Sequence, residues 1–254
     1  MPGKGFGGMV DFHTHILPGI DDGSRDTETT RQMLAEERRQ GVDLIVATPH
    51  FYANRMSVEG FLENRSRAEE KTRRILREMG ADSPELICGA EVYFFPGIGR
   101  ADAVKKLCIG ESGTLLLEMP FGQWGEQELE DVQGLLRQGM RIVLAHVERY
   151  YDFQKDIGIW DQVMDLDLMK QINAGSFLSP GKVQTLLGRG RKRSFCLRFL
   201  QEHKETMIGS DCHNLTSRRP NIAEGRKAIA DALGNDTLGR IDRAAEAALA
   251  REKR

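Results

Sequence analysis

From residue 9 onward, short apolar runs alternate with longer amphipathic segments. The apolar runs predict seven strands, at residues 9–13, 44–48, 86–91, 114–119, 141–146, 169–173 and 206–210. The amphipathic segments predict helices at residues 26–40, 58–79, 127–138, 182–202 and 221–233, with less regular segments at 102–107 and 157–166. Another helix is expected after Gly234, before a charged tail. Such repeated strand–helix alternation is typical of a parallel sheet with helical crossovers, and so of an α/β fold.

The chain is expected to form one domain. No break in composition and no linker rich in Pro, Gly or Ser divides residues 9–254, which favours a single barrel-like unit with a C-terminal helical tail. Residues 1–8 are half glycine and are expected to form a flexible N-terminal extension. Their Gly3-x-Gly5-x-x-Gly8 spacing matches a dinucleotide fingerprint, but that motif must follow a strand, and this one precedes the first.

Composition narrows the function classes. The 254 residues carry 36 Lys and Arg against 38 Asp and Glu, a net charge of −2 that argues against a nucleic-acid binder. No apolar run is long enough to span a bilayer, and the first residues lack the apolar segment of a secretion signal. The four cysteines form no CxxC pair, which argues against a disulfide framework or a zinc ribbon. We therefore expect a cytoplasmic protein without membrane insertion or a nucleic-acid partner.

Histidines and carboxylates gather where the predicted strands end. Five of the six histidines lie there, and His203 on a helix end is the exception, interpreted as an ordinary side chain. The side chains at or just after these ends are His13, His15, His50, Glu91, Glu118, His146, Asp211 and His213. In a parallel barrel these ends meet at one rim, where several buried charges without a cation would be unpaired. Nitrogen and oxygen ligands without thiolate suit divalent zinc, manganese or iron, and this many ligands implies more than one ion.

Five sequence blocks, in order, carry a family resemblance. They are Asp11-Phe-His13-Thr-His15 with Asp21-Asp22-Gly23, Thr48-Pro-His50, Gly89-Ala-Glu91-Val-Tyr93, His146-Val-Glu148-Arg149-Tyr150 and Ser210-Asp211-x-His213-Asn214. The chain resembles the polymerase-and-histidinol-phosphatase (PHP) family over residues 9 to about 235. Its Asp-Asp-Gly and His-x-Glu-Arg-Tyr blocks are closer to the bacterial protein-tyrosine phosphatase branch that accompanies capsule and exopolysaccharide synthesis.

The resemblance implies a distorted seven-stranded (β/α)7 TIM-like barrel with three divalent metal ions, often manganese or iron, with zinc also possible. It implies one ion held by His13, His15, Glu91 and Asp211, a second by Glu91, Glu118 and His146, and a third by Asp22, His50 and His213. Arg149 and Arg218 match the arginines that such enzymes place near the phosphate group of the substrate. Arg219 is an alternative to Arg218 for that role. The implied substrate is a phosphotyrosine-bearing bacterial polysaccharide co-polymerase tyrosine kinase.

Two other function classes stay open. A metal-dependent hydrolase of another ester or amide, such as a histidinol-phosphate phosphatase or an amidohydrolase-like enzyme, would use a similar ligand set. Amidohydrolases typically need a modified lysine near the fourth strand, which here ends in Glu118 with no lysine nearby. A metal-bound regulatory barrel would need no arginines for phosphate.

Two further features bear on the chemistry. Cys212 and Arg218 spell Cys-x5-Arg, the pattern of cysteine-dependent tyrosine phosphatases, but no glycine lies between them to form a phosphate loop. Strand alternation is also expected to turn Cys212 away from Asp211 and His213. Among the aromatic residues in loops, we expect at least one of Tyr52, Phe121 and Trp124 to contact a phosphotyrosine ring.

Overall fold

The computed structural model describes residues 8–179 and 189–251. Its strands are β1 (Met9–Thr14), β2 (Val42–Ala47), β3 (His50–Phe51), β4 (Glu85–Cys88), β5 (Glu91–Tyr93), β6 (Thr114–Glu118), β7 (Arg141–Leu144), β8 (Met169–Asn173) and β9 (Thr206–Gly209). Its α-helices are α1 (Thr27–Arg39), α2 (Val58–Met79), α3 (Glu126–Arg137), α4 (Gly158–Met164), α6 (Arg189–Glu202), α7 (Ile222–Leu233) and α8 (Asn235–Leu249). Short 3-10 turns are η1 (Ile98–Arg100), η2 (Asp102–Leu107), η3 (Val147–Arg149), η4 (Tyr151–Phe153) and η5 (Ala174–Phe177).

Each of the seven predicted strand regions contains a strand, but region 86–91 is divided into two strands and region 44–48 is followed by a further short strand. Pro49 separates β2 from β3, because proline has no N–H to donate to a sheet ladder. Gly89 separates β4 from β5 where the chain runs so close to Ile109 that a Cβ at Gly89 would lie 2.6 Å from the Ile109 side chain. The structure therefore has nine strands in its described part, where the sequence predicts seven.

The predicted helices are present with small shifts at their ends. The Asp26 side chain accepts a hydrogen bond from the Thr29 N–H (2.7 Å) and caps α1, and Ser57 caps α2 in the same way. The helix predicted at 182–202 is observed from Arg189, and its expected start lies outside the described residues. The predicted N-terminal extension also lies outside them, apart from Gly8. None of the described helices combines the length and apolarity that a membrane crossing requires.

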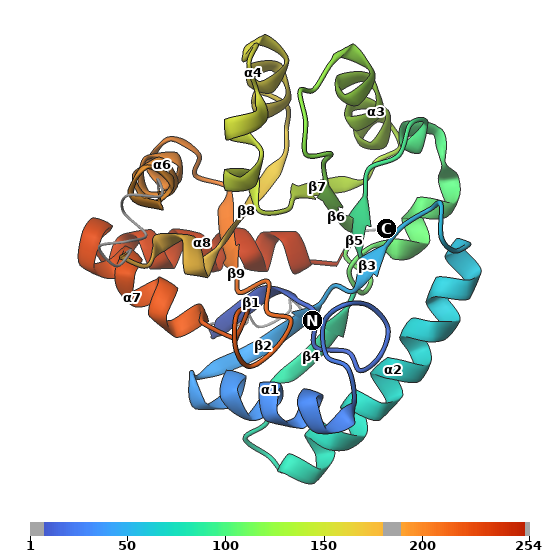
Figure 1. Ribbon diagram of the computed structural model, residues 1–254, viewed down its shortest axis with the longest axis vertical. Coiled ribbons are helices and arrows are strands. Elements are labelled where there is room, and N and C mark those ends of the chain that lie inside the picture. Colours follow the sequence, from blue (N-terminus) through green and yellow to red (C-terminus); the bar gives the residue numbers. More distant parts are fainter. Residues whose placement is uncertain (1–7, 180–188, 252–254) are drawn as a thin grey trace.

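All strand pairs are parallel, and they form two sheets. One sheet has the order β1-β2-β4 and the other β3-β5-β6-β7-β8-β9. The two sheets meet where β2 and β4 continue into β3 and β5, and again at a bridge between Thr14 and Cys212. There the Asp211 N–H donates to the His13 carbonyl (2.8 Å). Figure 1 shows the strands gathered at the centre of the molecule with the helices around them.

The hydrophobic core has two parts. A larger part lies between the sheets and the surrounding helices. A smaller one lies among the strands and includes Phe12, Leu44, Leu116 and Met207, together with alanines of α8. Thr114, at the first residue of β6, donates to the Ala248 carbonyl, so α8 covers the end where the strands begin. The polar side chains are therefore left to gather at the opposite, carboxyl-terminal end.

Candidate metal centre

A first group of predicted ligands meets at one oxygen of Glu91. His13 Nε2 and His15 Nε2 lie 3.1 Å apart, and each lies 3.2 Å from Glu91 Oε2. Asp211 Oδ1 lies 3.7 Å from His13 Nε2 and 3.5 Å from His15 Nε2. All four side chains are buried. These distances would let His13, His15 and Asp211 surround one ion together with Glu91.

The other oxygen of Glu91 faces a second group. Glu91 Oε1 lies 2.8 Å from His146 Nε2, which lies 3.4 Å from Glu118 Oε1. His50 also reaches this group, with Nδ1 3.0 Å from Glu91 Oε2 and 3.7 Å from Glu118 Oε2. A carboxylate whose two oxygens face different ligand groups is suited to bridge two ions.

A third group lies toward the surface. His50 Nε2 and His213 Nε2 lie 3.6 and 3.5 Å from Asp22 Oδ1, and His15 lies beside them. Asp22 is exposed, unlike the other predicted ligands. The structure thus brings all nine predicted ligands to one end of the strands. The groups share more members than the sequence predicts, because His15 and His50 each lie in two of them.

The backbone is unusual at three of these ligands. Pairing of β1 with β2 is irregular between Asp11 and Thr14, as in a β-bulge, which lets Phe12 join the inner core while His13 faces Glu91. His146 and Asp211 have φ of 32° and 54°, and no other non-glycine residue in the described ranges has a positive φ. Such conformations are costly and persist where the surroundings impose them, commonly at functional sites.

Outer partners fix the orientation of two imidazoles. Asp21 Oδ2 lies 2.7 Å from His15 Nδ1 and accepts a hydrogen bond from the His50 N–H. His213 Nδ1 lies 3.0 Å from the Asp211 carbonyl. Because both partners are acceptors, each Nδ1 carries a proton, and each Nε2 faces the centre, where it can bind a metal ion once it carries no proton of its own. Asp21 has no role predicted from the sequence, although it stands directly before the predicted ligand Asp22.

The charges of the centre call for a cation. Burial opposes charge on the two imidazoles, yet Asp21 and Glu91 raise the pKa of His15 to about 10, and Glu118 and Glu91 raise the pKa of His146 to about 9. Burial would raise the pKa of Glu91, but His13 and the neighbouring imidazoles hold that pKa well below its usual range. The buried atoms His50 Nδ1, Glu91 Oε2, Glu118 Oε2 and His213 Nε2 make no hydrogen bond of suitable geometry, although imidazole nitrogens lie close to both carboxylates. Divalent ions would satisfy these atoms, and the N/O donor set fits manganese, iron or zinc.

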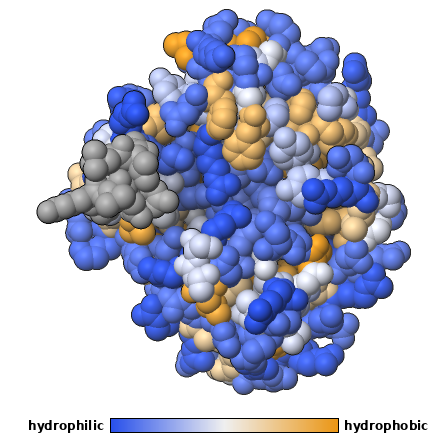
Figure 2. Space-filling view, in the orientation of Figure 1, coloured by the Kyte–Doolittle hydropathy of each residue, from blue (hydrophilic) through white to orange (hydrophobic). Residues whose placement is uncertain are grey.

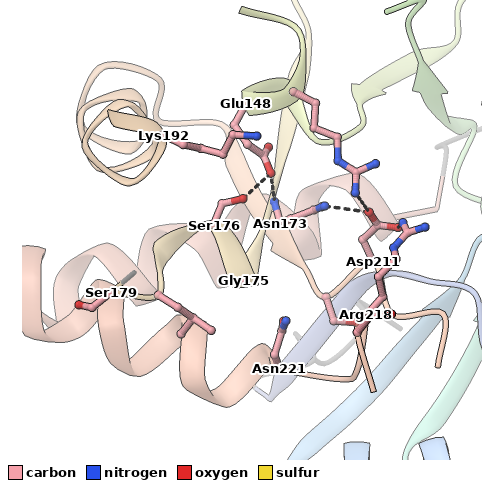
Figure 3. A pocket seen from close by; sticks show the side chains of 13 residues that line it. Glu148, Asn173, Gly175, Ser176, Ser179, Lys192, Asp211, Arg218 and Asn221 are labelled. Atoms are coloured by element: carbon pink, nitrogen blue, oxygen red, sulfur yellow. Dashed lines mark hydrogen bonds and ion pairs between the residues drawn. The ribbon is translucent and has the colours of Figure 1, made fainter. Parts of the chain in front are cut away.

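Two arginines lie against the centre from opposite sides of one carboxylate. Arg149 Nη2 donates to Asp211 Oδ2 (2.6 Å), and Arg218 Nη2 donates to Asp211 Oδ1 (2.7 Å). The rival Arg219 instead pairs with Glu224 (2.8 Å). Beside Asp211 is a cavity of about 500 Å³ lined by both arginines and by polar side chains that include Lys192 (Figure 3). The middle of this face of the molecule is correspondingly hydrophilic (Figure 2).

Cys212 does not face this cavity. Its side chain is fully buried, and Sγ lies 3.6 Å from Glu37 Oε1 on helix α1. Burial and the nearby carboxylate of Glu37 raise the pKa of the thiol well above its usual value. Cys212 therefore lacks both the position and the ionisation of a nucleophile, as the strand alternation predicts.

Two of the three loop aromatics lie beside ligand rings. Phe121 is exposed and stacks on His146, with 6.1 Å between the ring centroids. The ring centroids of Tyr52 and His50 lie 5.2 Å apart. Trp124 is buried, and its Nε1 donates to the Pro120 carbonyl. Phe121 and Tyr52 are thus placed to contact a substrate, and Trp124 belongs to the core.

Known proteins with similar sequences match nearly the whole length of this chain. Residues 9–249 match the family model described as capsular polysaccharide synthesis, CpsB/CapC. The chain is 29% identical to the tyrosine-protein phosphatase CpsB of Streptococcus pneumoniae over 238 residues, which cover 89% of this chain and 91% of that protein. It is 27% identical to the tyrosine-protein phosphatase YwqE of Bacillus subtilis over 234 residues, covering 90% and 86% of the two chains.

Solved structures share the fold. A chain from the crystal structures of YwqE from Bacillus subtilis and CpsB from Streptococcus pneumoniae, described as unique metal-dependent tyrosine phosphatases, superposes with a TM-score of 0.79. That match has 22% identity and covers 96% of each chain. The lactonase Lmo2620 of Listeria monocytogenes superposes with a TM-score of 0.57 at 11% identity, covering 97% of this chain and 95% of the lactonase.

Proposed function

The chain belongs to the CpsB/CapC family of capsular polysaccharide synthesis, and from this premise we propose that it is a metal-dependent protein-tyrosine phosphatase. Its substrate would be phosphotyrosine on a bacterial polysaccharide co-polymerase tyrosine kinase that regulates capsular or exopolysaccharide synthesis. The curated relatives named above are tyrosine-protein phosphatases, and the alignments cover most of both chains. We place the protein in the wider PHP family on the strength of the five sequence blocks.

One observation carries the proposal. Buried imidazoles and carboxylates converge on Glu91, and two arginines approach the same place through Asp211. A structural metal site would close its ligand shell and would need no nearby guanidinium groups. Arginines beside a cluster of metal ligands are suited to bind the oxygens of a phosphoryl group.

Three divalent ions fit the residues present, with manganese as our first choice and iron or zinc as alternatives. We assign His13, His15, Glu91 and Asp211 to one ion, Glu91, Glu118 and His146 to a second, and Asp22, His50 and His213 to a third. When bound, such ions supply Lewis acidity toward the phosphoryl oxygens and a nucleophile at neutral pH. Glu91 would hold the first two ions at a fixed separation, because its two oxygens face the two groups.

The protein's own residues would bind and orient the phosphoryl group. Arg149 and Arg218 each keep donors beyond the one that binds Asp211, and these can reach phosphoryl oxygens at the edge of the cavity. Phenolate is a modest leaving group with a pKa of about 10, so it departs with little help from a general acid. The five imidazoles are committed to metal in this assignment, which makes a phenolic ester the easier substrate.

The surroundings of the centre suit a phosphorylated tyrosine on a peptide. Phe121 stacks on His146 and is exposed on its outer side, which would offer a face to the substrate ring. Tyr52 lies on the other side of the centre, beside His50. The polar cavity beside Asp211 leaves room for residues next to the phosphotyrosine.

We also propose that the two sheets together form a distorted seven-stranded (β/α)7 TIM-like barrel, with β2 and β3 as one interrupted strand and β4 and β5 as another. The bridge between Thr14 and Cys212 supports closure between the first and last strands. We treat residues 9–254 as a single domain. A cytoplasmic location is in keeping with four buried cysteines that form no disulfide.

A substrate panel tests the proposed function. The metal-stripped protein is assayed with a phosphotyrosine peptide, the matched phosphoserine peptide and histidinol phosphate, before and after addition of Mn2+. We expect Mn2+ to restore turnover, with the highest kcat/KM for phosphotyrosine. Preference for histidinol phosphate would instead favour a small-molecule phosphatase.

An amidohydrolase-like activity is disfavoured because such enzymes typically need a modified lysine near the fourth strand. Here β6 ends in Glu118, and the buried Lys170 of β8 donates to the Met164 carbonyl.

A further inference from the structure

Strand β8 supplies no predicted metal ligand, yet two of its side chains reach the centre. Each of the other predicted strand regions has at least one of the nine ligands within it or within two residues after its end. Gln171 and Asn173 are alternate residues of β8 and therefore lie on the same face of the strand. Both are buried, and neither received a role from the sequence.

The Gln171 side chain fixes how His13 presents its ring. Gln171 Oε1 lies 2.7 Å from the His146 backbone nitrogen and 3.1 Å from His13 Nδ1. A backbone N–H can only donate, so the amide atom at this position must be the oxygen. The same oxygen then requires a proton on His13 Nδ1. His13 Nε2 is left as the ring nitrogen that faces Glu91 and His15 and can bind a metal ion.

Asn173 continues this chain of hydrogen bonds to Asp211. Gln171 Nε2 donates to Asn173 Oδ1 (2.9 Å), and Asn173 Nδ2 donates to Asp211 Oδ2 (2.8 Å). Figure 3 shows the hydrogen bond between Asn173 and Asp211. Arg149 Nη2 donates to the same Asp211 oxygen. The His146 N–H fixes which end of the Gln171 amide is the oxygen. The Gln171 nitrogen must then donate to Asn173 Oδ1, and the Asn173 nitrogen must donate to Asp211, so these hydrogen bonds have only one possible direction.

The chain of hydrogen bonds also joins the two strained ligands. His146 and Asp211 have positive φ, and Gln171 binds His146 at its backbone nitrogen while Asn173 binds Asp211 at its side chain. Strained conformations persist when neighbouring contacts impose them. Two amides on one rigid strand provide such contacts for ligands that come from other parts of the chain.

We propose that Gln171 and Asn173 are positioning residues that orient His13 and Asp211 for metal binding and hold the turn at His146. This inference rests on the proposed metal-dependent function. Outer partners of metal ligands commonly change metal affinity by about 10- to 100-fold when they are removed. Gln171→Met keeps nearly the same volume but removes the acceptor that His13 and His146 share.

The test measures Mn2+ binding by the full-length protein after chelation. Isothermal titration gives the dissociation constant and stoichiometry, and elemental analysis gives the metal content. We expect Gln171→Met to weaken the tightest Mn2+ site by about 10- to 100-fold. Gln171→Glu keeps an acceptor for both donors and is expected to retain more of the wild-type affinity. Asn173→Ala should weaken binding less, because Arg149 and Arg218 still hold Asp211.

Gln154→Met is the matched control. Gln154 is also buried and hydrogen-bonded, accepting from the Trp124 N–H and donating to the Gly122 carbonyl, but it contacts no predicted ligand. It should lower the melting temperature of the metal-free protein without changing the Mn2+ dissociation constant. A similar loss of affinity in Gln154→Met would overturn the inference, because general destabilisation would then explain the effect.

The positioning role and the proposed function are overturned by different results. Unchanged Mn2+ affinity and stoichiometry in Gln171→Met would overturn the positioning role and leave the proposed function intact. If that variant does not fold, unchanged affinity in Asn173→Ala overturns the role in the same way. Absence of Mn2+ binding by the wild-type protein would overturn the proposed function and this inference with it.

Discussion

Arg149 Nη2 donates to Asp211 Oδ2 across 2.6 Å, so a predicted phosphate-binding arginine is held by a predicted metal ligand. Burial opposes charge on Arg149, but Asp211 and Glu148 keep the pKa of its guanidinium above the usual value. A charged guanidinium group held at the edge of the cavity needs little rearrangement to donate to a phosphoryl oxygen.

The first prediction concerns this arginine. Arg149→Ala should lower kcat by about 10²-fold or more, because a donor that acts on developing charge is lost. Arg149→Lys should recover little, since a point charge does not reproduce two parallel donors. Steady-state kinetics with the phosphotyrosine peptide, alongside elemental analysis, separates this effect from loss of metal. Wild-type kinetics in Arg149→Ala would show that the residue does not contact substrate.

The second prediction distinguishes two neighbouring arginines. Arg218 binds Asp211, whereas Arg219 pairs with Glu224. Arg218→Ala should therefore lower kcat/KM by about 10-fold or more, and Arg219→Ala should leave it nearly unchanged. The two variants remove the same group one residue apart, so each controls for the other. The opposite ranking would assign the phosphate-binding role to Arg219.

The third prediction is that turnover depends on bound metal. Chelation should abolish activity, and Mn2+ should restore it, because the buried carboxylates and imidazoles need a cation to be compensated. His13→Ala should prevent restoration, since it removes a donor from the group around Glu91. Metal content is measured by elemental analysis of the same samples. Full activity in metal-stripped protein would contradict the assignment.

The positions of the ligands could be predicted from the sequence because strand ends are visible in it. His13, Glu118 and His146 each end or follow a short apolar run, and parallel strands bring such ends together. The breaks at Pro49 and Gly89 were less visible. A proline or glycine next to an apolar run permits a break, but the contact of Gly89 with Ile109 appears only in the fold.

The outer partners of the ligands could not be predicted in this way. Gln171 is 158 residues from His13 in the chain, and its hydrogen bond depends on the order of strands across the sheet. Positive φ at His146 and Asp211 has no local signal either, because neither residue is a glycine. Asp21 could have been considered as a partner of the ligands, since it stands beside Asp22. The sequence does not show, however, which of the two adjacent carboxylates contacts which imidazole.

The fourth prediction concerns pH and metal affinity. Despite burial, neighbouring carboxylates raise the pKa of His15 to about 10 and that of His146 to about 9, so both are protonated at neutral pH when no metal is bound. A divalent ion must displace these protons. Apparent Mn2+ affinity should therefore rise with pH through the range above about 6.5, where ordinary imidazoles are already neutral.

Titration in two buffers with different ionisation enthalpies measures the protons released on binding. We expect net release at neutral pH. The same raised pKa values should stabilise the metal-free protein fully below about pH 6.5, the unfolded pKa. That stabilisation should be lost as pH rises through about 9 to about 10. Mn2+ affinity that is level over this range would contradict the prediction.

The last prediction separates two phosphatase mechanisms that share a sequence pattern. Cys212 and Arg218 have the spacing of a cysteine-dependent tyrosine phosphatase, and Arg218 does lie at the centre. A nucleophilic cysteine needs an accessible thiolate with a lowered pKa. Cys212 is instead fully buried against Glu37, and burial holds the pKa of its thiol well above the usual value.

Cys212→Ser should therefore keep most of the wild-type kcat, because a serine hydroxyl can still donate to Glu37 and no reacting atom is lost. Alkylating reagents should inhibit weakly and slowly, since the thiol becomes accessible only when the protein opens. Kinetics and elemental analysis of Cys212→Ser decide between the mechanisms. A fall in kcat of more than about 10²-fold with unchanged metal content would mean that the thiol takes part in the reaction, because a serine hydroxyl is a far weaker nucleophile than a thiolate.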